Sequence, residues 1–204
     1  MSSLPHISPA MTPTLPAPPV RVHEPGSGDV DIFPLPTDQD FLLVLLDDLF
    51  VNHWDKIVFG TLIQGAVFEI RVPAPPRRVR CHDGYLTVDF GLWHFHVCIG
   101  LNRGSARNPT DDGLGRLRRT GRAELYRAIS RDGTPRSWGL RLFNGANENQ
   151  LTVFFPNPLL GDNDKILKQP DYSRLALWDA VRERYLGLPP DPLDRTATGF
   201  PCGG

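Results

Sequence analysis

The sequence has few cysteines, no long apolar run and almost no net charge. Its three cysteines, in a chain of 204 residues, are an odd number without regular spacing. This excludes a disulfide framework and favours a reducing compartment, so we expect a cytoplasmic protein. The longest apolar cluster, residues 41–46, is far shorter than the ~20 residues that cross a bilayer, which argues against a membrane protein. The formal net charge of −1 gives no positive field that would attract nucleic acid.

Prolines, by contrast, are frequent at both ends of the chain. Because proline has no backbone N–H, a segment rich in it forms neither a helix nor a regular sheet ladder. We therefore expect residues 1–36 to be a disordered or extended tail; the alternative is a segment that packs on the domain through Ile32, Phe33 and Leu35. Residues 188–204 form a second tail, rich in Pro and Gly, which leaves a single domain at 37–187. Both tails are candidates for contact with a protein partner.

The periodicity of apolar residues changes twice along the domain. Helical spacing predicts a helix at about 38–54 and another at about 174–186, the second ended by Gly187. Between them, alternation and turn residues predict strands at 64–72, 77–82, 85–90, 93–99, 123–130, 137–143 and 150–155. The order predicts an α+β fold: an antiparallel, curled sheet of about six to seven strands, packed by an N-terminal and a C-terminal helix.

Two tight turns set the register of a three-stranded meander at 77–99, in the centre of this sheet. Asp83-Gly84 favours a type I′ turn and Gly91-Leu92 a type II′ turn. Two-residue loops fix which side chains face one another, so one face of the meander is predicted to be polar and the other apolar. The polar face would carry Arg78, Arg80, His82, Tyr85, Thr87, Asp89, His94, His96 and Cys98.

The polar face is the candidate site, and a metal is the first interpretation of it. Imidazoles and a thiolate are ligands for divalent transition metals, with zinc favoured and iron or copper as alternatives. His94 and His96 lie two residues apart on one strand, whereas positions i and i+4 are about 13 Å apart, too far for one ion without strong twist. We therefore expect His94 and His96 as ligands, completed by Cys98 or His82.

Other polar residues have predicted roles around that ion. Asp89, opposite His94, is a candidate for fixing the imidazole tautomer, and we group it with Tyr85 and Arg80 as candidate catalytic residues. Arg78, Arg80 and Glu69 are candidates for binding a small anionic substrate.

The His94-Phe95-His96 strand resembles the first two zinc ligands of α-type carbonic anhydrases and the opening of the cupin metal motif. The resemblance is limited to these residues. Glu124-Leu125-Tyr126 lacks the third histidine of the anhydrase pattern, and Ile99-Gly100-Leu101 stands where the cupin pattern has a glutamate. No family is assigned on this ground.

Three interpretations of the polar face remain open. The first is a small metalloenzyme in which a metal-activated water or a Lewis-acid metal acts on an anionic substrate. The second is a non-catalytic accessory protein whose polar sheet face and Pro-rich tails contact a protein partner, since a half-buried antiparallel sheet has a polar face in any case. The third is thiol chemistry at Cys98, with His96 or His82 as base and Arg78 or Arg80 favouring the thiolate.

Overall fold

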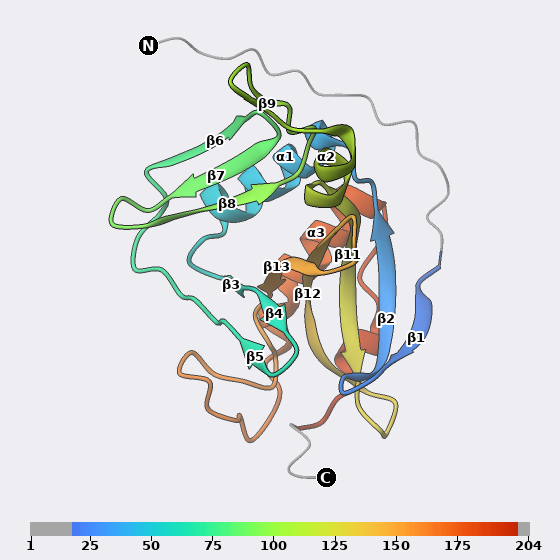
Figure 1. Ribbon diagram of the computed structural model, residues 1–204. Coiled ribbons are helices and arrows are strands. Elements are labelled where there is room, and N and C mark those ends of the chain that lie inside the picture. Colours follow the sequence, from blue (N-terminus) through green and yellow to red (C-terminus); the bar gives the residue numbers. More distant parts are fainter. Residues whose placement is uncertain (1–17, 200–204) are drawn as a thin grey trace.

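The computed structural model describes residues 18–199 and has an α+β architecture, as the sequence predicts (Figure 1). A six-stranded sheet, antiparallel at every pairing, forms its centre in the order β1-β2-β11-β12-β13-β3. Its strands are β1 (Val20–Glu24), β2 (Gly28–Leu35), β3 (Val58–Gly60), β11 (Thr120–Ile129), β12 (Pro135–Asn144) and β13 (Asn149–Phe154).

The predicted meander forms a sheet of its own, with β6 (Arg78–His82), β7 (Tyr85–Asp89) and β8 (His94–Cys98) in that order. It therefore lies beside the large sheet instead of at its centre. Two small hairpins complete the strands: β4 (Leu62–Ile63) with β5 (Ala66–Val67), and β9 (Gly104–Ser105) with β10 (Asn108–Pro109).

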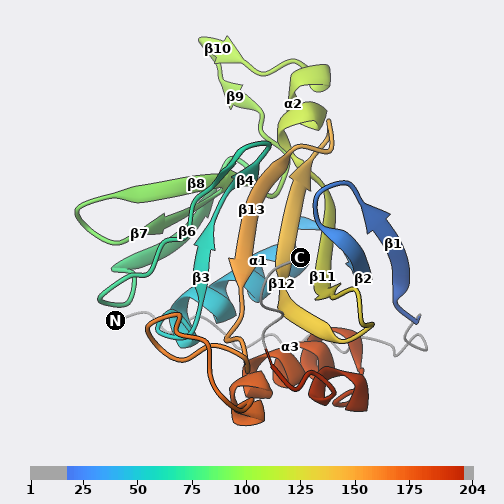
Figure 2. The ribbon, with the colours of Figure 1, turned by 90° about the horizontal axis from the view of Figure 1, so that it is seen from below.

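Within residues 18–199, three α-helices accompany these sheets. They are α1 (Gln39–Asp47), which continues into a π-helical turn at Asp48–Asn52, α2 (Asp112–Arg118), and α3 (Ala176–Leu186), which follows a 3-10 turn at Tyr172–Leu175. Figure 2 shows α1 and α3 on one side of the curved six-stranded sheet. None of the helices within 18–199 is long and apolar enough to cross a membrane.

Local signals explain where α1 begins and where α3 ends. The Asp38 side chain accepts a hydrogen bond of 2.9 Å from the Phe41 backbone N–H and so caps α1, which begins within one residue of the start expected at about 38. Gly187 ends α3 in the left-handed conformation, with φ of 66°, as predicted. The inner face of α1 carries Leu42, Leu45 and Leu46, all fully buried.

A single apolar cluster joins the helices to both sheets. Phe33, Leu125 and Leu140 contribute to it from the large sheet, and Trp178 from α3. Leu86, Val88 and Val97 enter the same cluster from the meander, which confirms that the apolar side of the predicted register faces the core. The meander is thereby fixed to the body, and its other face is exposed or half-buried except at Cys98.

The expected N-terminal tail is wrong for residues 20–35, which form β1 and β2. Phe33 and Leu35 are buried in the core, which agrees with the alternative that this segment packs on the domain. The pairing is consistent with a proline at this place: β1 begins at Val20, opposite Ile32, so Pro34 lies beyond the part of β2 that β1 covers and has a partner strand, β11, on one side only. Residues 1–17 lie outside the described part of the chain.

The expected C-terminal tail is also wrong for part of its length. Residues Pro192–Arg195 form a 3-10 turn, and Asp194 within it is completely buried. Its carboxylate accepts hydrogen bonds from the indoles of Trp138 and Trp178, so the turn is bonded directly to the core. Residues 200–204 lie outside the described part of the chain.

The strand expected at 64–72 is reduced to β5 and one isolated bridge between Ile70 and Phe59. The physical reason is a turn at Gly65, with φ of 86°, which folds β5 back on β4 and leaves Val67 and Phe68 exposed. Alternation alone does not reveal such a reversal. The strands expected at 123–130, 137–143 and 150–155 correspond to β11, β12 and β13.

Candidate functional site

The register of the meander is the one predicted from its turns. Across β7 and β8, Asp89 faces His94, Thr87 faces His96 and Tyr85 faces Cys98. Across β6 and β7, Arg78 faces Asp89, Arg80 faces Thr87 and His82 faces Tyr85. Asp83 and Gly84 both have positive φ, 47° and 79°, as a type I′ turn requires. The nine polar candidates therefore form three rows of three across one face.

The two histidines are neighbours on the exposed part of this face. Their ring centroids are 4.9 Å apart with an interplanar angle of 72°. Nδ1 of His96 is 2.7 Å from the Thr87 hydroxyl, and both imidazoles are exposed to solvent. Asp89, next to His94, accepts a hydrogen bond of 2.8 Å from the Gly91 N–H and pairs with Arg78 at 3.4 Å.

The other predicted ligands do not converge on the histidine pair. His82 lies in the same row as Cys98 but two strands away, a separation of about 9 to 10 Å between backbones. Glu69, predicted to bind the substrate, is exposed on the segment between β5 and β6, outside the meander. Within residues 18–199 no group of three His, Cys, Asp or Glu side chains is arranged to hold one ion.

Cys98 is buried, and its chemistry follows from that burial. Its Sγ donates to the Gly100 carbonyl at 3.4 Å, and desolvation raises the pKa of the thiol. Desolvation likewise raises the pKa of the Tyr85 phenol beside it. Because the thiolate is the reactive form, a buried thiol with a raised pKa is a weak nucleophile at neutral pH. The exposed side chains of Arg78, Arg80 and His82 do not reverse this effect.

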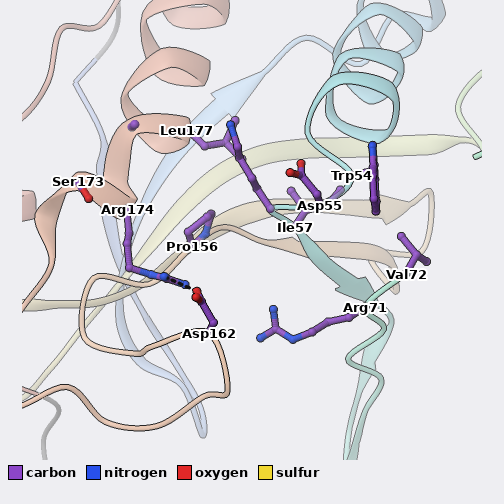
Figure 3. Close-up of a pocket in the computed structure, with 12 residues that line it drawn as sticks. Trp54, Asp55, Ile57, Arg71, Val72, Pro156, Asp162, Ser173, Arg174 and Leu177 are labelled. Carbon is purple, nitrogen blue, oxygen red and sulfur yellow. Dashed lines mark hydrogen bonds and ion pairs between the residues drawn. The ribbon is translucent and has the colours of Figure 1, made fainter. Parts of the chain in front are cut away.

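A polar pocket lies elsewhere, between the end of the π-helical turn and the start of α3 (Figure 3). Its volume is about 510 Å³, and four separate segments of the chain supply its lining. Three cationic side chains, Lys56, Arg71 and Arg174, and two carboxylates, Asp55 and Asp162, line it. Trp54, Ile57, Val72, Pro156 and Leu177 give it an apolar wall.

Both arginines of the polar pocket are paired with acidic residues of one loop. Arg174 Nη1 is 2.7 Å from Asp162 Oδ1, and Arg174 Nε donates to the Asn157 carbonyl at 3.2 Å. Arg71 Nη2 is 2.6 Å from Asp164 Oδ1. In Figure 3 the Arg71 and Arg174 side chains extend toward one another from opposite sides, with Asp162 between them.

A family model matches residues 19–187, most of the chain. The chain belongs to DUF7676, a family of unknown function. A search of curated proteins finds no match to it. The DUF7676 match includes the meander and the polar pocket, and it ends at the glycine that caps α3, before the 3-10 turn that carries Asp194.

Sequence reasoning missed the polar pocket of this DUF7676 member because its residues are far apart in the chain. Arg71 is part of a segment expected to be a strand, and Arg174 was expected only as the first residue of a helix. Two short runs in the sequence could have pointed to the pocket, because each places charged residues in a connection between elements. They are Trp54-Asp55-Lys56 and Asp162-Asn163-Asp164. Neither signal indicates that the two runs meet.

A second, apolar cleft of about 250 Å³ separates the meander from β3 and β13. The residues that line it include Phe59, Phe68, Trp93, Phe95 and His96. Trp93 also stacks on Phe90, with ring centroids 4.7 Å apart. His96 therefore lies next to aromatic rings, and the cationic groups on the same face as the histidine pair are Arg78 and Arg80.

Proposed function

We propose that this protein binds a small organic anion in the polar pocket. The observation that carries the proposal is the meeting of Arg71 and Arg174, 103 positions apart in the chain, on one cavity with Lys56. A volume of about 510 Å³ lies in the range of sites for small molecules. Guanidinium groups bind carboxylate and phosphate through paired N–H donors, which supports an anionic ligand.

The walls of the polar pocket support an organic ligand over a bare inorganic ion. Trp54, Ile57 and Leu177 present apolar surface on which the carbon skeleton of a ligand would lose its contact with water. The first residues of α3, Ala176 and Leu177, line the same cavity, so the positive end of the helix dipole adds to the cationic side chains. Asp55 offers a carboxylate that accepts a hydrogen bond from a ligand hydroxyl or ammonium group.

A thermal-shift screen of small carboxylates and phosphates, followed by calorimetric titration, tests the proposal. We expect at least one such anion to raise the unfolding temperature, and Arg71→Gln and Arg174→Gln to weaken its binding about 10- to 100-fold, because each loses charge-assisted hydrogen bonds. Arg131→Gln is the matched control, since Arg131 is an exposed arginine in the turn between β11 and β12. Absence of binding by every tested anion, or binding by both pocket variants as tight as that of the wild type, contradicts the proposal.

A second candidate function is transition-metal binding at the histidine pair. The specific observation is that the His94 and His96 rings are 4.9 Å apart, with Asp89 opposite His94. Because both side chains are exposed, rotation about their χ angles would bring the two rings to one shared ion. Titration with zinc tests it: His94→Ala and His96→Ala should weaken zinc binding about tenfold or more. His82→Ala should leave binding unchanged, because His82 lies two strands away. Equal binding by all three variants rules the pair out.

A further inference from the structure

A hairpin carries the two carboxylates that occupy the arginines of the polar pocket. Leu167 N donates to the Leu159 carbonyl at 2.9 Å and Leu160 bridges Ile166, which closes the base of this hairpin. Its tip, residues 161–165, is held by a bond of 2.8 Å from Gly161 N to the Lys165 carbonyl. Asp162 and Asp164 project from this tip, so one short turn presents two carboxylates.

The contacts between the tip and the polar pocket are exposed and therefore weak. The Asp162 side chain is 90% exposed in its pair with Arg174, and the Asp164 side chain is 62% exposed in its pair with Arg71. Ion pairs in water contribute little to stability because both groups are well solvated when separated. The base of the hairpin has its own backbone bonds, so the tip can leave the arginines while the base stays in place.

The charges of the polar pocket match a ligand with two negative groups. Lys56, Arg71 and Arg174 supply three positive charges, and Asp55 supplies one negative charge from the body of the protein. The remaining excess of two positive charges equals the charge of Asp162 and Asp164 together. The two carboxylates of the tip thus match this excess, each on its own arginine, while Lys165, the last residue of the tip, is not among the residues that line the pocket.

We infer that the ligand is an organic dicarboxylate whose two carboxylates replace Asp162 on Arg174 and Asp164 on Arg71. This inference rests on the proposed function and names its ligand class. The tip acts as an internal competitor: it satisfies the arginines in the empty protein and is displaced when the ligand binds. A dicarboxylate that reaches both arginines forms two carboxylate–guanidinium contacts, although the translational and rotational freedom of only one molecule is lost. A monocarboxylate loses similar freedom and forms only one such contact.

Calorimetric titration with a length series tests this inference. The probes are malonate, succinate, glutarate and adipate, each beside the monocarboxylate of equal chain length, and inorganic phosphate. We expect one dicarboxylate length to bind about tenfold or more tightly than its monocarboxylate partner. We expect Asp162→Asn/Asp164→Asn to bind that dicarboxylate about 3- to 10-fold more tightly than the wild type, since the competitor is lost. The matched control is Asp112→Asn, an exposed acid in the first turn of α2.

The outcomes separate this inference from the proposed function. Equal binding of dicarboxylates and monocarboxylates, unchanged affinity in the double variant, or tighter binding of phosphate than of every dicarboxylate overturns the inference and leaves an anion site in place. If no carboxylate or phosphate binds either the wild type or the double variant, the proposed function itself fails. Each single Asn variant should give part of the gain, because each frees one arginine.

Discussion

The Asp194 carboxylate accepts a hydrogen bond of 2.7 Å from the indole nitrogen of Trp138, across 56 positions of the chain. Its second oxygen accepts one of 2.8 Å from the Trp178 indole, and Arg127 and Arg182 lie within 3.1 and 3.4 Å. Four donors from the sheet and α3 therefore meet one carboxylate of the C-terminal segment. This contact ties residues 191–197 to the core.

Asp194→Ala should lower the free energy of unfolding by about 3 to 5 kcal/mol, because it leaves buried cationic groups and two indole N–H groups without a partner. Urea denaturation measures the change. Asp191→Ala is the control: its side chain is 29% exposed, so water replaces it more easily and the loss should be smaller. Equal losses in the two variants would argue against burial as the cause.

Acid should destabilise the protein through Asp31. Burial alone would raise the pKa of this carboxyl, but hydrogen bonds from Arg21 and Arg127 outweigh it and hold the pKa below the ordinary 3.8. A lowered folded-state pKa means that the stabilisation is present above the unfolded-state pKa and is lost as pH falls through the folded-state value. We expect the urea midpoint to fall as pH drops below about 4, and Asp31→Asn to be less stable at pH 7 with a weaker dependence in this window.

The Cys98 thiol should be unreactive in the folded protein. Burial raises its pKa and excludes reagent, so Cys98→Ser should leave the number of thiols that react with a thiol reagent within minutes unchanged. After unfolding in urea the same variant should show one reactive thiol fewer than the wild type. Rapid loss of one folded-state thiol in Cys98→Ser would restore the thiol interpretation of the polar face.

Gly84 should be irreplaceable in the turn between β6 and β7. It has φ of 79°, and a Cβ at this position would lie 2.7 Å from the Gly100 carbonyl oxygen. Gly84→Ala should therefore cost about 2 to 3 kcal/mol, from backbone strain and from the clash. Gly133→Ala isolates the first effect, since φ is 83° and nothing lies within 4 Å. If chemical denaturation gives the same loss for both, the close approach to Gly100 is unimportant.

The meander was predictable because everything that specifies it is local. Asp83-Gly84 and Gly91-Leu92 determine two turns, and alternation then places His94, His96 and Asp89 on one face with the observed register. The polar pocket was not predictable, because Arg71 and Arg174 meet only after the chain has folded. The burial of Asp194 was not predictable for another reason. The proline content of its segment indicates a tail, and a single buried carboxylate produces no periodic pattern in the sequence.

Arg127 joins the two ends of the described chain. Its guanidinium binds Asp31 from β2 at 2.8 Å and Asp191 from the C-terminal segment at 2.7 Å, with 4% of its side chain exposed. A nascent chain that has emerged only as far as α3 contains the first partner without the second. Because a buried charge without its full set of partners is costly, such a chain cannot reach its final stability. The charged cluster around Arg127 is therefore complete only after Asp191 and Asp194 have been synthesised.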